Sequence, residues 1–551
     1  MHQKAYWGRY SNQPELIKQA YLDLFSSPPA LVALDTETIS LSNKTLIGIG
    51  LATPLMDCFF FDVNDPGLPW HLIRPGPTRK VWHNGTFDLA TDVLGPYGPD
   101  IDNIDDTALM TRLLGVETEL SLAAPTVGAS TWSTRELLNE YKATTMAQLP
   151  YETVALKCIA DVWAVMKLYL QHAGRLNRES YEVERRTESL VLHMSYRGIG
   201  LDQQLVQRID SELGQQAELF KGTCVTQGFN PFSPQQVAYT LTQEGAFLPW
   251  KRGATQPSTS EEDLLEVGTT KALITVAARK YNKLYKVVHG WVGKPRLHSH
   301  FHLAAITGRI TSEDPQLHNV PTGKRPGDII PRAGPVRRVL RADSGWFTKF
   351  DLSQIELRVL AHLSQDKEML RVLSLPKDQG GDIHIATQRA LGLSDKLMAK
   401  NFNFGTIYGG DPEILSKFTG IKDMARLASY QKLLAAYYPQ MWAYTQDMRQ
   451  QGLHDLEVET MYGRKISLID PVLKSAKHAM NCAVNYPIQG AAAEIFKRIL
   501  LEAARFVPIE SFILQVHDEQ LFDGVQTLPQ GLDRIAGFWT PLETSVIERW
   551  Q

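Results

Sequence analysis

The sequence predicts a chain of at least two domains: an α/β unit at the N-terminus, followed by a larger, helix-rich α+β region. Apolar, strand-like stretches at 31–35 and 46–63 alternate with helical stretches at 105–114 and 152–170, which is the pattern of an α/β fold. Near 171–180 the sequence becomes polar, and long helical stretches follow. The 551 residues exceed what one hydrophobic core organises, so we expect a domain boundary at this point.

The second region is predicted to be helical to about residue 295 and then to return to strands. Loops rich in Pro, Gly, Ser and Thr lie at 249–261 and 321–335, and the second one precedes the strand-like segment WFTKFD. Helices dominate again from 355 to about 450. The last hundred residues or so mix helix with a hairpin.

Composition and charge exclude several classes of protein. The 43% hydrophobic and 21% charged residues are typical of globular domains and not of disordered chains. A net charge of −3 excludes a small basic DNA-binding module, so any nucleic-acid contact must come from local basic patches. The four cysteines are far apart, which favours reduced thiols over disulfides or a zinc site. Neither a signal-like segment nor a run of about 18 apolar residues occurs, which disfavours secretion and membrane spanning.

Two acidic segments of the C-terminal region suit phosphate chemistry. Asp351 ends a strand at a strand-to-helix junction, and Asp518 follows an apolar strand within SFILQVHDEQLFDGV. Mg²⁺ prefers one or two carboxylates together with waters and substrate phosphates. Each segment also has a structural interpretation: Ser353 with Glu356 fits a helix capping box, and HDE fits an ordinary hairpin turn.

A third segment, KLMAKNFNFGTIYGG, has the spacing of a functional helix face. Lys396, Lys400 and Phe404 lie four residues apart and share one face, and Tyr408 continues the row. The lysines could grip phosphates while an aromatic ring stacks on a base. The alternative is a solvated lysine face beside a core phenylalanine.

Taken in order, DLSQIELR, KxxxKxxxFGxxYG and QVHDE resemble the three polymerase motifs of family A DNA polymerases, the bacterial DNA polymerase I type. TGRITSEDPQLHNVP, DIH and NYPIQGAAAEIFKR match as well, and the similarity runs from about residue 178 to the C-terminus. The resemblance implies a right-hand polymerase domain with an α+β palm and helical thumb and fingers. The expected bounds are 176–295 for the thumb, 296–364 and 451–551 for the palm, and 365–450 for the fingers.

The resemblance also implies a role for each matching residue. Two Mg²⁺ ions, with Mn²⁺ as a substitute, would be held by Asp351 and Asp518, and Glu519 would assist. Lys400 would be the general acid for pyrophosphate. The family usually has Arg at position 396, so the lysine there predicts weaker nucleotide binding. The residues expected to bind the nucleotide are Gln354, Glu356, His384, Lys396, Lys400, Phe404 and Tyr408.

Contacts to primer–template DNA follow from the same resemblance. Minor-groove contacts near the primer end reach acceptors that all correct base pairs share. Basic thumb residues would follow the phosphate backbone independently of sequence, although an exposed helical face explains each of them equally well. The expected minor-groove residues are Arg309, Asn485, Gln489 and His517, and the expected backbone contacts are Arg279, Lys280, Lys283 and Lys286.

Glu356 indicates a deoxyribonucleotide substrate. In the family this side chain fills the space that a ribose 2′-hydroxyl would need. Overpacking costs about 1–3 kcal/mol, or about 5–150-fold against ribonucleotides. Single-subunit RNA polymerases share the general architecture but lack this acidic gate, so Glu356 argues for DNA synthesis.

Four acids near the N-terminus form a second candidate metal site. Asp35 and Glu37 lie two apart on a strand and project to one face. A DxE pair alone is more often a strand end than a site. With Asp88 and Asp161 following in order, the set resembles the DEDD exonucleases, whose fold is ribonuclease H-like, over about 28–172. The resemblance implies that the four acids bind two divalent metal ions for 3′–5′ hydrolysis.

One residue departs from the proofreading pattern. Lys157 stands where such exonucleases usually carry Tyr, and Leu156 where some carry His. Positioning groups of this kind contribute on the order of 10²–10⁴ to the rate, so we expect an active but slower exonuclease in the domain 1–175. A mismatched primer end frays readily and would reach such a single-strand site.

Two rival interpretations stay open at this point: a DEDD nuclease whose C-terminal region only holds nucleic acid, and a non-catalytic nucleic-acid clamp. The expected partners are primer–template DNA, dNTPs and a processivity factor, helicase or single-strand-binding protein, with no membrane and a monomeric chain. Because the chain begins just before the exonuclease motif, we expect no separate 5′ nuclease domain. This favours a phage protein of DNA replication, acting in the host cytoplasm.

Overall fold

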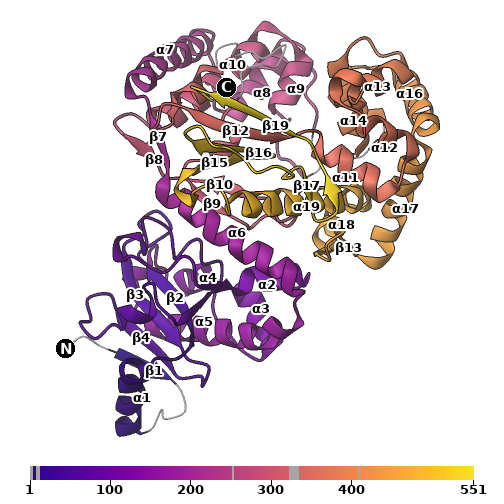
Figure 1. The fold of residues 1–551 in the computed structure, drawn as a ribbon. Helices are drawn as coiled ribbons and strands as arrows, with labels where there is room; N and C mark the ends of the chain where they lie inside the picture. Colours follow the sequence, from indigo (N-terminus) through magenta and orange to yellow (C-terminus); the bar gives the residue numbers. More distant parts are fainter. Residues whose placement is uncertain are drawn as a thin grey trace.

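Hydrophobic side chains gather in two regions of the chain that one long helix joins. The computed structural model describes residues 4–7, 13–250, 253–321, 334–407, 410 and 412–550. In Figure 1 the N-terminal sheet lies at the bottom, the larger C-terminal region lies above it, and α6 (Arg178–Arg197) runs between them. Within the described ranges, no helix is both long and apolar enough to cross a membrane.

The N-terminal region is a six-stranded sheet with an apolar core on each face. In the order β1-β4-β3-β2-β5-β6, β5 pairs in parallel with β2 and β6, and the other pairs are antiparallel. Val32 and Leu34 enter one core, and Ala33 enters the other, beneath α5. Because side chains alternate along a strand, Asp35 and Glu37 share the α5 face.

The elements of this region agree with the predicted strands at 31–35 and 46–63. The strands are β1 (Lys4–Trp7), β2 (Leu31–Thr38), β3 (Leu46–Ala52), β4 (Cys58–Asp62), β5 (Arg79–Trp82) and β6 (Ile104–Asp106). The helices are α1 (Pro14–Ser26), α2 (Thr107–Leu113), α3 (Leu120–Ala123), α4 (Thr134–Glu140) and α5 (Tyr151–His172).

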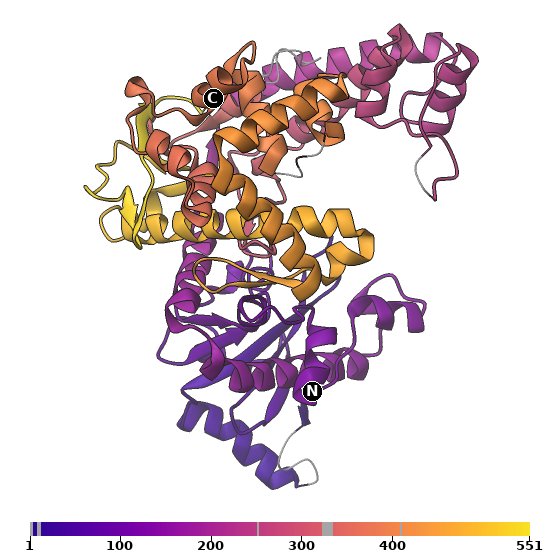
Figure 2. The same cartoon turned by 90° about the vertical axis from the view of Figure 1, so that its right-hand side faces the viewer.

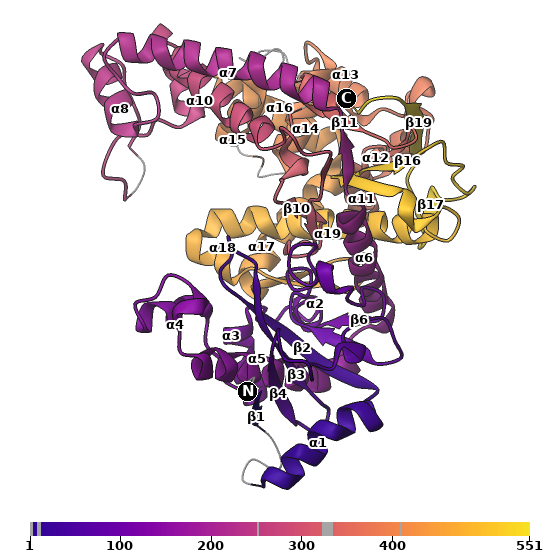
Figure 3. The same cartoon turned by 90° about the vertical axis from the view of Figure 1, so that its left-hand side faces the viewer.

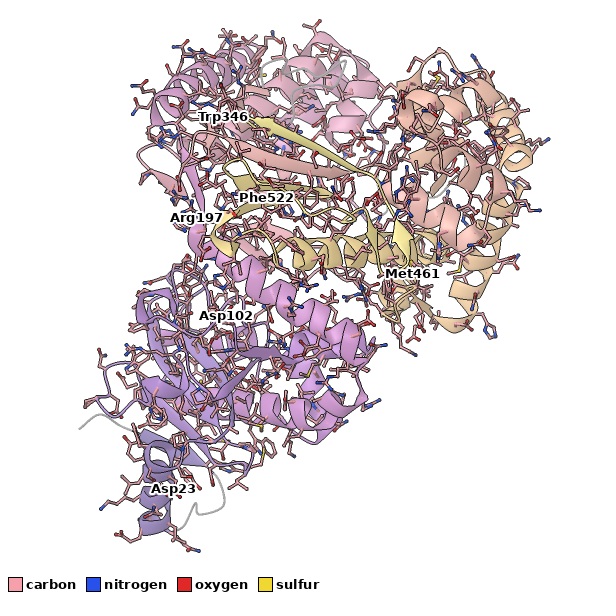
Figure 4. The ribbon with its side chains drawn as sticks, viewed as in Figure 1. Asp23, Asp102, Arg197, Trp346, Met461 and Phe522 are labelled. Carbon is pink, nitrogen blue, oxygen red and sulfur yellow. The ribbon has the colours of Figure 1, made fainter. Side chains whose placement is uncertain are left out.

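Helix α6 fastens the two regions together through charged contacts. Glu184, in its first half, accepts hydrogen bonds from Lys497 Nζ at 2.8 and 2.6 Å and a further one from Arg464 at 2.5 Å. At its C-terminal end, Arg197 binds Asp523 of the central sheet at 2.7 Å, and Figure 4 labels Arg197 at this junction. Leu192 of the same helix lies in an N-terminal core and Leu190 in the C-terminal core, so α6 belongs to both.

A four-stranded antiparallel sheet in the order β15-β16-β12-β19 forms the centre of the C-terminal region. The ring of Phe350 lies 5.8 Å from that of Phe522 and 5.9 Å from that of Phe496, so α19 covers one face of this sheet. The elements are β12 (Phe347–Leu352), β15 (Phe512–Val516), β16 (Glu519–Asp523), β19 (Leu542–Ile547) and α19 (Ala476–Ala503).

Helices flank this sheet in two groups (Figure 1). On one side, α7 and α10 run side by side and carry a small core with α8 and α9 (Figure 3). In Figure 2, α19 lies between these helices and the N-terminal region. The first group is α7 (Gln203–Thr226), α8 (Pro234–Gln243), α9 (Glu261–Val267) and α10 (Thr270–His289). The second is α11 (Ile355–Ser364), α12 (Lys367–Leu373), α13 (Ile383–Leu391), α14 (Lys396–Ile407), α15 (Pro412–Thr419), α16 (Met424–Tyr437) and α17 (Pro439–Asp455).

Short strands account for most of the differences from the sequence prediction. The stretch predicted as helical to about 295 contains the strand β7, directly after α6. This strand pairs with β8 and β11. The short elements are β7 (Ile199–Leu201), β8 (Arg296–Leu297), β9 (His300–His302), β10 (Thr311–Glu313), β11 (Leu340–Arg341), β13 (Glu457–Glu459), β14 (Lys465–Ser467), α18 (Ile469–Lys474), β17 (Arg534–Ile535) and β18 (Phe538–Trp539).

The capping-box interpretation of Ser353 and Glu356 is wrong. Helix α11 begins after Gln354, which adopts a left-handed φ of 57°, and among the described residues no side chain caps it. The Glu356 carboxylate is instead ion-paired with Arg309. This acid is therefore held by a distant part of the chain and not by its own helix terminus.

Candidate active site

Asp351 and Asp518 lie at neighbouring ends of two paired strands. The register sets Asp351 opposite Glu519, and the N–H of Leu352 donates to the carbonyl oxygen of Asp518 at 3.1 Å. The tight turn between β15 and β16 is possible because His517 adopts a left-handed φ of 57°. Folding thus brings together the two aspartates that the sequence suggests as metal ligands.

The positive charge around these two carboxylates does not compensate their burial and mutual repulsion. Burial, and then the charge of Asp518, raises the pKa of Asp351 to about 7. Burial also raises the pKa of Asp518, with a further contribution from Glu356. Raised values mean that the ionised pair is costly until a cation compensates it, and carboxylate oxygens are the ligands of hard divalent ions. The donor set fits Mg²⁺ or Mn²⁺.

A cavity of about 490 Å³ opens beside Asp518. Its lining comes from the β15–β16 turn, the start of α11, one face of α14, the C-terminal half of α19 and the loop after β9. A space with acids on one wall and a lysine and an aromatic ring on another could hold a nucleotide. The predicted site residues that line it are Arg309, Gln354, Glu356, Lys400, Phe404, His517 and Asp518.

Glu519 is held differently from the two aspartates. Its carboxylate is ion-paired with Lys349 and accepts a hydrogen bond from the indole N–H of Trp550. Trp550 is fully buried. The carboxylate of Glu519 is therefore already neutralised by the protein, which separates it from the pair Asp351 and Asp518.

Asp382 contacts three of the predicted nucleotide-binding residues. It caps α13, accepting from the N–H groups of His384 and Ile385, and it forms an ion pair with Lys396 at 2.5 Å. Gln354 Nε2 also donates to it, at 3.3 Å. Asp382 was predicted only as part of the matching DIH segment, and the sequence carried no signal of this anchoring contact.

His384 lies against the α14 face that the sequence singles out. Its ring nitrogen Nδ1 is 3.1 Å from Asn403 Nδ2, and its ring centroid is 5.9 Å from that of Phe404. Lys400 Nζ lies 5.9 Å from the same Phe404 ring. Burial, with help from Lys400, lowers the pKa of His384 to about 4. Asn403 carried no signal in the sequence, and Tyr408 lies outside the described residues.

The residues predicted to touch DNA divide into two sets. Arg309 and His517 line the cavity, whereas Asn485 and Gln489 lie on α19. Residues four apart share a helix face, so Asn485 and Gln489 continue the row to Ala493, which lines the cavity. Asn485 is buried, and within the described chain its Oδ1 has no hydrogen-bond partner.

A family model described as DNA polymerase family A matches residues 202–531. The chain belongs to this family. The DNA polymerase I, thermostable, of Thermus filiformis is 31% identical over 372 residues, which is 62% of this chain and 43% of that protein. The DNA polymerase I of Pseudomonas aeruginosa is 26% identical over 551 residues, 90% of this chain and 59% of that protein. The chain thus spans about half the length of these curated relatives.

A solved structure shares the fold of this family A chain along nearly its whole length. It is the POL domain of Pol1 from M. smegmatis in complex with DNA primer-template and dNTP. The TM-score is 0.71 at 21% identity, and 94% of each chain is covered. The similarity therefore includes most of the N-terminal sheet, which the family model does not reach.

The four N-terminal acids of this family A chain meet between β2 and α5. Asp35 and Glu37 come from β2, and Asp161 comes from α5. Lys157, one helical turn before Asp161, lies among them: its Nζ is 2.7 Å from Glu37 Oε1 and 2.7 Å from Asp161 Oδ2. Asp88 accepts through Oδ1 from the N–H and hydroxyl of Thr36, at 3.0 and 2.6 Å.

Charge in this cluster is only partly balanced. Burial, then the neighbouring acids Asp161 and Asp88, raises the pKa of Asp35 well above its usual range. Burial raises the pKa of Asp88 to about 7. Burial opposes the charge of Lys157, but the carboxylates outweigh it and raise the pKa of Lys157 well above its ordinary value. The surrounding carboxylates therefore favour the charged form of Lys157.

A cavity of about 480 Å³ adjoins this cluster. Asp35, Lys157 and Asp161 line it, together with side chains such as Arg112 and Trp132. All four acids and the departure at Lys157 were visible in the sequence. The direct contact of Lys157 with two of the acids was not predicted.

Proposed function

We propose that the chain is a template-directed DNA polymerase that adds dNTPs to a primer 3′ end. The observation that carries this proposal is the pairing of Asp351 and Asp518 beside a cavity lined by Lys400 and Phe404. Family membership supports it, because the three matching motifs supply these residues. In this proposal α7–α10 form the thumb, α12–α17 the fingers, and the central sheet with α19 the palm.

The proposed division of labour follows from chemistry. Asp351 and Asp518 would hold two Mg²⁺ ions, which would supply a lowered pKa for the primer 3′-hydroxyl and positive charge for the triphosphate. Lys400 contacts the triphosphate and protonates the departing pyrophosphate. Phe404 stacks on the incoming base, and Glu356 excludes a ribose 2′-hydroxyl. Lys396 and His384, which both contact Asp382, bind phosphate.

The proposed DNA path uses fewer basic residues than the sequence suggests. Arg279 donates to the carbonyl oxygens of Pro231 and Thr259 at 2.7 and 2.6 Å, so it fastens loops of the α7–α10 group. Lys280 is ion-paired with an acid of α9 at 2.6 Å. Lys283 and Lys286 are exposed and remain the candidates for phosphate contacts.

Primer extension with dNTPs and Mg²⁺ tests the proposal. We expect Asp518→Ala to abolish incorporation while its thermal unfolding stays close to that of the parent. Glu510→Ala, which removes an exposed acid outside the proposed site, is the matched control and should extend normally. Unchanged extension by Asp518→Ala would refute the assignment.

The four N-terminal acids raise a second candidate activity, 3′–5′ exonuclease. Their assembly beside a cavity supports it, and the ammonium of Lys157 within the cluster counts against it. Degradation of a labelled single strand in Mg²⁺, measured in Asp518→Ala, tests it separately from synthesis. Digestion that disappears when Asp35→Ala is added would support the slower exonuclease that the sequence predicts.

A further inference from the structure

Lys157 occupies the position that a bound cation would take between Glu37 and Asp161. Its ammonium makes contacts of 2.7 Å with one oxygen of each. The side chain is only 9% exposed, so the ammonium is largely shielded from solvent. Residues 157 and 161 lie four apart on α5, and this places both side chains on the face that packs against β2.

Other hydrogen-bond donors of the protein contact further carboxylate oxygens of the cluster. The Thr131 hydroxyl donates to Asp161 Oδ1, and Thr36 donates twice to Asp88 Oδ1. The Cys158 thiol lies 3.4 Å from Asp35 Oδ2. A divalent ion of the Mg²⁺ type needs several oxygens at about 2.0–2.1 Å, and the ammonium already occupies Glu37 Oε1 and Asp161 Oδ2. The cluster with Lys157 in place therefore does not fit a divalent ion.

The same cluster without Lys157 would fit one. Ligand atoms of Asp35, Glu37 and Cys158 lie within 4.8 Å of one another, and Asp161 faces Glu37 across the ammonium. Removing the single positive charge would leave buried carboxylates without a counter-ion. Such a group of oxygens is costly when empty and favourable when it holds a hard cation.

We propose that Lys157 is the resident cation of the N-terminal acid cluster, so the native chain binds no divalent ion there and loss of the ammonium creates a divalent-cation site. The N-terminal unit then keeps its fold without metal and carries no metal-dependent hydrolysis, which is the alternative to the exonuclease activity considered above. This inference concerns Asp35, Glu37 and Asp161 alone and does not depend on the proposed polymerase activity.

The test uses the full chain carrying Asp351→Ala and Asp518→Ala, which removes the other candidate metal site. Mn²⁺ binding is measured by electron paramagnetic resonance, and thermal unfolding is followed in EDTA and in Mn²⁺. Lys157→Met removes the charge and keeps much of the side-chain volume; Lys157→Arg keeps the charge. We expect no Mn²⁺ binding in the chain that keeps Lys157 or in Lys157→Arg, and at least one bound ion in Lys157→Met.

Stability gives a readout that does not involve catalysis. We expect Lys157→Met to unfold at a lower temperature than its parent in EDTA. Saturating Mn²⁺ should raise that temperature by about 5–10 °C and leave the parent unchanged. Adding Asp35→Asn to Lys157→Met should weaken Mn²⁺ binding at least tenfold, which locates the ion.

Three outcomes would overturn the inference. One is Mn²⁺ binding by the chain that keeps Lys157, lost on Asp35→Asn. Another is a folded Lys157→Met chain that binds no Mn²⁺. The third is a Lys157→Met chain that stays unfolded in Mn²⁺ while Lys157→Ala, the smaller replacement, also fails to bind. None of these outcomes bears on primer extension, so failure here and failure of the proposed function are distinguishable.

Discussion

Arg309 and Glu356, which line the same cavity as Asp518, form an ion pair. The Glu356 side chain is 12% exposed and that of Arg309 is 38% exposed, so the arginine lies on the solvent side of the acid. Arg309 comes from the loop after β9, whereas Glu356 lies in the first turn of α11. The residue expected to exclude ribose is thus oriented by a residue expected to touch DNA.

Replacing Glu356 should weaken the discrimination against ribonucleotides. Glu356→Ala removes the bulk that would clash with a 2′-hydroxyl, so we expect ribonucleotide incorporation relative to dNTP to rise by about 5–150-fold. The measurement is the ratio of kcat/KM for a single rNTP and its dNTP. Arg309→Lys should raise the ratio less, because it keeps a cation beside the acid. An unchanged ratio in Glu356→Ala would show that Glu356 does not exclude ribonucleotides.

Glu519 should matter more for stability than for synthesis. Its carboxylate is neutralised by Lys349 and Trp550, so Glu519→Gln leaves the lysine without its partner. We expect a loss of about 1–3 kcal/mol in the free energy of unfolding and incorporation within about tenfold of the parent. Thermal unfolding and primer extension on the same preparation check this. A loss of extension as deep as in Asp518→Ala, at unchanged stability, would instead make Glu519 catalytic.

Local sequence patterns predicted the parts of the site that lie on one element. The row Lys396, Lys400 and Phe404 follows from helical spacing, and the shared face of Asp35 and Glu37 follows from strand alternation. The resemblance was needed to join Asp351 and Asp518 in one site, because 167 residues (518 − 351) separate them and the contact arises from the pairing of β12 with β16.

Contacts between distant elements could not be predicted in this way. The sequence gives no local reason for Lys157 to bind Glu37, since the contact depends on how α5 packs across β2. The same holds for Glu184 and Lys497, which lie 313 residues apart. The capping-box prediction failed for a related reason: Glu356 is ion-paired with Arg309 from a distant loop, and no side-chain cap is seen at the start of α11 in the part of the chain that the structure describes.

Acidification should destabilise the fold through His384. Its folded pKa is about 4, below the ordinary value of 6.5, because the ring is buried. Between these values the unfolded chain binds a proton that the folded chain does not, so stability is lost as pH falls from 6.5 to 4. The difference of 2.5 units corresponds to about 3 kcal/mol at most.

The measurement is the midpoint of urea unfolding at pH 7 and at pH 4.5. His384→Asn carries no titrating ring, so its stability should fall less between the two pH values than that of the parent. His454→Asn is the control, because the His454 side chain is 88% exposed. Equal acid sensitivity in His384→Asn and the parent would contradict the prediction.

Among the acids of α6, Glu184 should contribute most to the free energy of unfolding. It is 1% exposed and binds both Lys497 and Arg464, so removing its charge leaves two buried cations with one acid, Glu494, between them. Breaking a buried ion pair by removing one partner costs about 3–5 kcal/mol. We expect Glu184→Gln to lower the free energy of unfolding by about that amount.

A neighbouring acid offers a matched control for this prediction. Glu182 lies on the same helix, is 43% exposed and pairs with Arg185 at 2.9 Å, and a surface pair of this kind contributes about 0–1 kcal/mol. Urea unfolding of Glu182→Gln should therefore resemble that of the parent. Adding Lys497→Met to Glu184→Gln should recover part of the loss, because the uncompensated ammonium disappears. If Glu182→Gln and Glu184→Gln cost the same, the charges on α6 do not fasten the two regions, and apolar packing alone must do so.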